Sequence, residues 1–115
     1  MNIDVTTAQA NPSVRIVHLS GRLDGTTSDA AAPTIMDALT QSGAGIIINL
    51  AGVDFISSAG LRVVLLLRKK AETDGKRLAL IAAQPPIYKI FKISELDKLL
   101  HFFEDEAQAI RALWP

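Results

Sequence analysis

Cysteine is absent from this sequence and histidine is scarce, which restricts the chemistry available to it. Without Cys the chain has no disulfide and no thiol nucleophile, and it lacks the best ligands for zinc. His18 and His101 are the only imidazoles, so a metal site would depend almost entirely on carboxylates. We therefore expect neither a metal site nor a cofactor.

An excess of charge is also missing, as is any long apolar run. The 12 Lys and Arg residues balance 12 Asp and Glu residues, so the formal net charge is zero. That balance gives no electrostatic footprint for nucleic acid or for an anionic membrane. No apolar run approaches about 18 residues and no signal peptide is recognisable, so we expect a cytoplasmic protein without direct membrane insertion.

Aliphatic residues are abundant, and the stretch that organises the chain, residues 45–70, is built from them. At 115 residues the sequence fits one domain, residues 1–115, with enough apolar surface for a core. Residues 46–50 form a nearly continuous aliphatic run, which is typical of a central parallel strand covered on both faces. We expect a loop over residues 51–56 and then a helix over residues 58–73.

Two adjacent hydroxyls, those of Ser57 and Ser58, mark the start of the expected helix. In this position either serine can simply be an N-cap that satisfies free backbone N–H groups. Gly60 costs the helix about 1 kcal/mol relative to Ala and removes a side chain beside Ser58. The alternative is that this turn, residues 57–60, is exposed and that another protein acts on it. We call it the seryl turn.

The flanking segments alternate between strand and helix patterns. A helix is expected over residues 28–41, although Pro33 is awkward in a helix interior and favours a start near that residue. The other expected elements are strands near residues 3–5, 14–19, 76–83 and 99–103, a short helix near residues 87–96 and a closing helix over residues 104–113. A strand, a helix and a strand in sequence predict a right-handed parallel crossover.

The run VDFISSAGL at residues 53–61 resembles the signature of the STAS domain, the family of bacterial anti-sigma factor antagonists. The resemblance continues upstream to GRLDG at residues 21–25 and downstream to a KRLALIA strand and a final acidic helix, so that it covers residues 12–113. The two motifs at this distance, in a chain of this size, are fairly specific. They imply an α/β fold: a single STAS-like domain with a mixed β-sheet of four to five strands and about four helices packed mainly on one face.

The resemblance implies a phosphorylation-gated binding module and not an enzyme. A family member without phosphate binds an anti-sigma factor and thereby releases a sigma factor. The anti-sigma factor is itself a serine kinase, a histidine-kinase-like ATPase, which switches the antagonist off by phosphorylating it, and a serine phosphatase resets the cycle. Aligned residue by residue, the accepting serine is Ser58. Relatives known for phosphorylation often have Asp just before it, where this sequence has Ser57, which is left as a second candidate acceptor.

The same resemblance assigns partner binding to the two motifs together. The residues concerned are Asp24, Ser57, Ser58, Ala59, Gly60, Leu61 and Arg62. Composition alone favours the explanation of Asp24 as a turn or helix-capping carboxylate. The sequence does not decide whether the domain forms a homodimer through its N-terminal strand.

Two other functions stay open. A stand-alone STAS subunit of a membrane lipid-transport ABC ATPase complex would use much the same helix face without a phosphorylation cycle, and an ATPase in a stable complex would distinguish it. A small enzyme with Ser58 as nucleophile would need an adjacent base and an oriented third group. His18 and His101 both lie in strand-like segments with no evident route to Ser58.

The expected central helix also contains more aliphatic residues than one buried stripe needs. Residues 63–67 are five consecutive aliphatics, VVLLL, and a helix packed on one face of a sheet buries only some of them. The remainder must meet a neighbouring helix or a partner protein.

Overall fold

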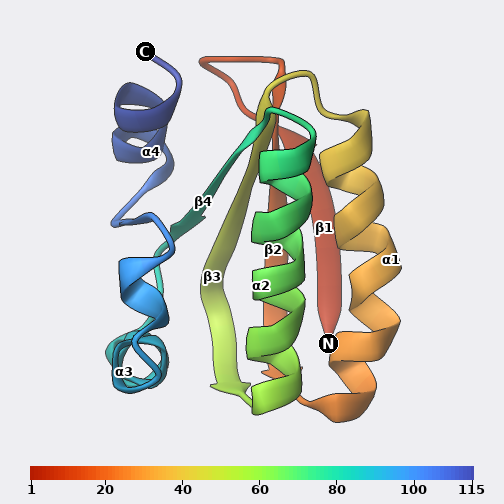
Figure 1. Ribbon diagram of the computed structural model, residues 1–115, viewed down its shortest axis with the longest axis vertical. Coiled ribbons are helices and arrows are strands. Elements are labelled where there is room, and N and C mark those ends of the chain that lie inside the picture. The colour runs from red at the N-terminus through yellow and green to blue at the C-terminus, as the bar shows by residue number, and fades with distance from the viewer.

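The computed structural model describes residues 1–115 as a five-stranded mixed sheet with four α-helices (Figure 1). The elements in chain order are β1 (Asn2–Thr7), β2 (Val14–Leu23), α1 (Gly25–Gln41), β3 (Gly45–Ile56), α2 (Ser58–Thr73), β4 (Arg77–Ile81), α3 (Pro85–Ile93), the 3-10 helix η1 (Leu96–Lys98), β5 (Phe102–Phe103) and α4 (Glu106–Leu113). The strands follow the order β1-β2-β3-β4-β5, with β1 antiparallel to β2 and all other neighbours parallel. The expected fold is therefore confirmed.

The central strand β3 is covered on both faces, as its aliphatic run predicts. Ile46, Ile48 and Leu50 belong to a core cluster that α1, α2 and α3 complete on one face of the sheet. Ile47 belongs to a smaller cluster on the opposite face, which α4 covers with Ala109 and other residues. Three helices on one face and one on the other explain why β3 shows no alternation of apolar and polar residues.

The single tryptophan holds the end of the chain against the sheet, next to the face that α4 covers. Trp114 follows α4, and its Nε1–H donates a hydrogen bond to the carbonyl oxygen of Ala44 at 3.0 Å. Ala44 immediately precedes β3, so the C-terminus lies at the end of the sheet where β3 begins. None of the α-helices combines the length and the hydrophobicity that spanning a membrane requires.

Most of the five consecutive aliphatic side chains of α2, residues 63–67, pack inside the domain. Val63, Val64 and Leu67 are buried, and α1 lies beside α2 on the same face of the sheet (Figure 1). Leu65 is half-buried, whereas Leu66 remains 48% exposed. The neighbouring helix therefore accounts for most of the run, and one leucine is left on the surface.

The expected loop over residues 51–56 is wrong, because β3 continues as a strand to Ile56. This second half of β3 pairs with β2 as far as the partners Leu23 and Ile56. Strand β4 ends at Ile81 and leaves the opposite edge open, where Gln84 Nε2 donates to the carbonyl oxygens of Ala51 at 2.8 Å and Val53 at 3.2 Å. Strand β2 and Gln84 are both remote in sequence from this half of β3, so no local sequence pattern indicates that it is a strand.

The expected start of α1 near residue 28 or Pro33 is also wrong, because the helix begins at Gly25 and includes the proline. Asp24 is the N-cap and forms a capping box with Thr27, which fixes the start one turn earlier than expected. Pro33 and Asp29, the residue four before it, are both exposed. The carbonyl that loses its N–H partner at the proline can therefore bond to water.

Candidate functional site

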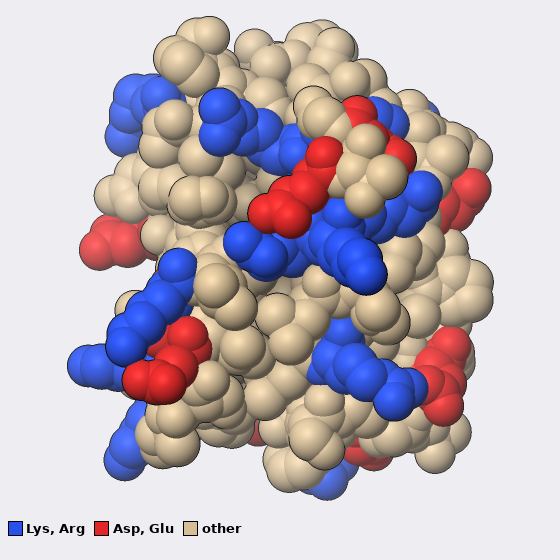
Figure 2. Space-filling model, viewed as in Figure 1, with Lys and Arg blue, Asp and Glu red and all other residues tan.

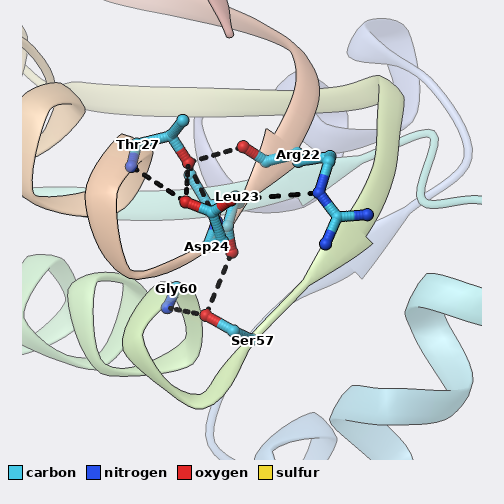
Figure 3. A network of polar contacts seen from close by, with 6 residues as sticks. All are labelled: Arg22, Leu23, Asp24, Thr27, Ser57 and Gly60. Atoms are coloured by element: carbon cyan, nitrogen blue, oxygen red, sulfur yellow. Dashed lines mark hydrogen bonds and ion pairs between the residues drawn. The ribbon is translucent and has the colours of Figure 1, made fainter.

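The two motifs meet at the carboxyl ends of the adjacent parallel strands β2 and β3. Strand β2 ends at Leu23 and β3 at Ile56, and these two residues are paired in the sheet. A helix begins immediately after each strand, with Asp24 as the N-cap of α1 and Ser57 as the N-cap of α2. Asp24 and the seryl turn consequently lie side by side (Figure 3).

One carbonyl group joins the two motifs directly. The carbonyl oxygen of Leu23 accepts a hydrogen bond from the Ser57 hydroxyl at 3.3 Å (Figure 3). It accepts another from the backbone N–H of Ser57 at 3.0 Å. Leu23 itself is buried in the core. The position of the seryl turn is thus fixed by Leu23, the last residue of β2, which Asp24 follows directly.

The structure separates the roles of the two serines. Ser57 is half-buried, and its Oγ accepts a hydrogen bond from the N–H of Gly60 at 3.4 Å, as an N-cap does. Ser58 is exposed, and its hydroxyl makes no hydrogen bond to any other residue. Ser57 therefore holds the turn together, whereas the Ser58 hydroxyl is accessible to another protein.

Gly60 allows the first turn of α2 to lie directly against the strand ends. A Cβ atom at this position would be 2.8 Å from Ile56 Cγ1, 2.8 Å from the Leu23 carbonyl oxygen and 3.0 Å from Leu23 Cγ. Real Cβ atoms essentially never approach other atoms as closely as 2.8 Å. The glycine is thus needed for close packing beneath the turn, a role that the sequence alone does not reveal.

Asp24 is the capping carboxylate of α1, and it also lies next to the seryl turn. Its Oδ1 accepts the backbone N–H of Thr27 at 3.1 Å, and the Thr27 Oγ1 accepts the backbone N–H of Asp24 at 2.9 Å. The hydrogen bond from the Thr27 backbone N–H, followed by that from its side chain, holds the pKa of the Asp24 carboxyl below its ordinary value of 3.8. The carboxylate stays ionised at neutral pH.

This carboxylate gives a testable dependence of stability on pH. Since the pKa is lower in the folded chain than in the unfolded one, Asp24 stabilises the fold above pH 3.8, and this contribution is lost as the pH falls through the folded-state pKa. We expect Asp24→Asn, which keeps a capping oxygen but cannot titrate, to lose less stability than the native chain between pH 7 and pH 3. Urea unfolding midpoints at both pH values measure the difference. Equal losses would contradict this assignment.

Arg22, a cation next to the site, was not among the predicted site residues. The Arg22 guanidinium carbon lies 4.0 Å from the centre of the Phe55 ring, and its Nε is 3.9 Å from Asp24 Oδ2. Arg22 and Phe55 are paired across β2 and β3. The signal was available only through the parallel register, which sets the arginine of one motif opposite the phenylalanine of the other.

The other predicted site residues lie on the first turns of α2. Ala59 and Leu61 are half-buried and Gly60 is buried, whereas Arg62 is exposed. All seven predicted residues thus gather where β2 and β3 end. Among them only Ser58 and Arg62 are exposed.

The two histidines lie elsewhere and have other contacts. His18 is on the sheet, where Nε2 lies 2.9 Å from Thr6 Oγ1 and Nδ1 lies 3.4 Å from Asn49 Nδ2. His101 lines a cavity of about 180 Å³ beside the C-terminal half of α2. No three His, Cys, Asp or Glu side chains are grouped so that they could hold a metal ion. Neither imidazole is bonded to the Ser58 hydroxyl, as a catalytic base would be.

Known proteins resemble this chain along nearly its whole length. The family model described as STAS domain matches residues 6–109. The anti-sigma F factor antagonist of Paenibacillus polymyxa is 29% identical over 114 residues, which cover 98% of this chain and 97% of the relative.

Solved structures give the same result for the fold. An anti-sigma-factor antagonist (STAS) domain protein from Planctomyces limnophilus superposes with a TM-score of 0.82 at 21% identity, covering 96% of each chain. The Bacillus cell fate determinant SpoIIAA in its phosphorylated form gives a TM-score of 0.69 at 23% identity, covering 96% of this chain and 98% of that one. At these identities the likeness establishes a shared architecture.

Proposed function

Because this chain belongs to the STAS domain family, we propose that it is an anti-sigma factor antagonist whose binding is gated by phosphorylation at Ser58. Without phosphate it binds an anti-sigma factor and thereby releases a sigma factor. The anti-sigma factor is the kinase, an ATPase of the histidine-kinase-like type, and a serine phosphatase restores the binding form. The curated relative from Paenibacillus polymyxa, which carries the antagonist name, supports this function. The proposal places the chain in the cytoplasm, where ATP is available.

The observation that carries the proposal is the free hydroxyl of Ser58. It is exposed at the first residue of α2, while the adjacent Ser57 hydroxyl is occupied by the Leu23 carbonyl and the Gly60 N–H. A kinase that reaches this turn finds one serine available and the other engaged. This favours Ser58 over Ser57 as acceptor.

Phosphorylation at this position suits a switch that leaves the domain folded. A phosphate adds close to two negative charges at neutral pH, together with three strong acceptor oxygens. The N-terminus of a helix tolerates such charge, because its backbone N–H groups and the helix dipole are positive there. In an interface packed against another protein, the same charge and bulk are unfavourable. The modification therefore acts on the complex and spares the fold.

Mass spectrometry of the intact protein tests the proposal. The chain is incubated with ATP and each genomically neighbouring ATPase, and peptide mapping follows. We expect one added phosphate in the native chain and none in Ser58→Ala. Ser57→Ala is the matched control: it should still accept the phosphate, although loss of the cap costs about 1 kcal/mol of stability.

The other outcomes are equally informative. Phosphate that disappears in Ser57→Ala and persists in Ser58→Ala would reverse the assignment of the acceptor. If no ATPase adds phosphate but one co-purifies tightly with the chain, the switch is wrong, and a constitutive subunit of a lipid-transport ATPase takes its place.

A further inference from the structure

The outward face of α2 carries two cations that no carboxylate neutralises. Among the cations of the helix, Arg68 pairs with Glu72 at 3.1 Å and Lys70 with Asp74 at 3.2 Å. Arg62 and Lys69 are exposed and form no ion pair. In Figure 2 blue side chains lie along the front of the molecule, where Figure 1 shows α2. Red side chains lie beside some of the blue ones, so the cations of this face without an ion partner are Arg62 and Lys69.

Of these two cations, Arg62 is the one that stands next to Ser58. It follows Ser58 by four residues, and residues at this spacing are neighbours on a helix surface, with Cβ atoms about 5–6 Å apart. Both side chains are exposed, and neither is engaged by another residue. The other cation of the site, Arg22, is already seated over the Phe55 ring and faces Asp24.

Resting on the proposed function, we propose that Arg62 is the internal partner of a phosphate on Ser58. A guanidinium binds phosphate through two parallel hydrogen bonds, which makes it a better partner than an ammonium. The order is also the favourable one, because an anion one turn before a cation agrees with the direction of the helix dipole. Arg62 thus positions the phosphate along the outer face of α2.

This pairing gives one modification two effects on the same partner. In the unmodified chain the Arg62 guanidinium is free, so it can bind a carboxylate on the anti-sigma factor. Phosphorylation adds negative charge at the seryl turn and also removes that cation from the interface. The pairing therefore predicts an acidic region on the anti-sigma factor, opposite the first turns of α2.

The test uses phosphoserine encoded genetically at position 58 of the full chain, so that no kinase is needed. Phosphorus NMR follows the second ionisation of the phosphate with pH. We expect its midpoint to rise by about 0.3 to 0.5 pH unit in Arg62→Gln, because a pair of this kind is worth a few tenths of a kcal/mol or more. Arg62→Lys should raise it by less.

Lys69→Gln is the matched control, since it removes the same charge from the same face. Lys69 lies about 16 Å along the helix from Ser58, which exceeds the screening length of about 8–10 Å in ordinary buffer, so the midpoint should not move. Equal midpoints in the native, Arg62→Gln and Lys69→Gln chains would overturn the pairing. That result would leave the proposed function intact if the phosphorylated chain still releases its anti-sigma factor. Conversely, a shifted midpoint supports the pairing even where no kinase modifies Ser58 and the proposed function fails.

Discussion

A chain that carries phosphoserine at position 58 is expected to bind its anti-sigma factor at least about a hundredfold more weakly than the unmodified chain. A hundredfold change corresponds to about 2.8 kcal/mol. Placing nearly two extra negative charges within a packed interface supplies a penalty of this size, since an unpaired charge in an interface costs several kcal/mol. Ser58 is exposed and uses its hydroxyl for no contact inside the domain, so the fold should be unaffected.

Titration of the purified anti-sigma factor against both forms of the chain measures this effect, and circular dichroism checks the fold. Phosphoserine at Ser13 provides the control. Ser13 is exposed and immediately precedes β2, whereas the site lies at the end of that strand of ten residues, about 30 Å away. The same charge there should leave the affinity within about twofold. Equal weakening by both phosphates would mean that net charge, and not the seryl turn, governs binding.

Gly60→Ala is expected to destabilise the domain by about 1–3 kcal/mol, against the direction that helix propensity predicts. Alanine in a helix is favoured over glycine by about 1 kcal/mol. At this position, however, the added methyl group would lie 2.8 Å from both Ile56 Cγ1 and the Leu23 carbonyl oxygen. Relieving that overlap requires the first turn of α2 to move off the strand ends, and overpacking of this kind typically costs 1–3 kcal/mol.

The variant Gly25→Ala separates the steric effect of an added methyl group from the higher helix propensity of alanine. Gly25 is the first residue of α1, and a Cβ there would meet no atom within 4 Å. We expect this variant to be as stable as the native chain or slightly more stable. Urea unfolding of the two variants and the native chain gives the comparison. A Gly60→Ala chain that is more stable than the native one would show that the seryl turn is not closely packed.

The elements that could be predicted are those whose signals are local. Helix α2 runs over residues 58–73, as predicted, because a capping serine stands at one end and Gly75 follows the other. The aliphatic run of β3 likewise indicated burial on both faces. The second half of β3 could not be found this way, because it is held by β2 and by Gln84, which are remote in sequence. The capping box of Asp24 and Thr27, which starts α1, is also a local signal, but the prediction relied on Pro33 and did not use it.

The same distinction applies to the candidate site. Its residues could be predicted from two short motifs, and the carboxyl ends of adjacent parallel strands bring those motifs together. Which serine caps and which is free could not be predicted, because the answer depends on the Leu23 carbonyl, which is 34 residues away in sequence. The contact of Gly60 with Leu23 and Ile56 was hidden for the same reason.

The position of Trp114 gives the chain an internal fluorescent reporter. Its indole N–H donates a hydrogen bond to the carbonyl oxygen of Ala44, just before β3 begins. The seryl turn, in contrast, follows the end of that strand. As the single tryptophan, it is the only indole emitter. A shift in its emission will therefore signal the release of α4 from the sheet. A phosphate on Ser58, at the opposite end of β3, is expected to leave the emission spectrum unchanged, so that this signal would separate unfolding from the proposed switch.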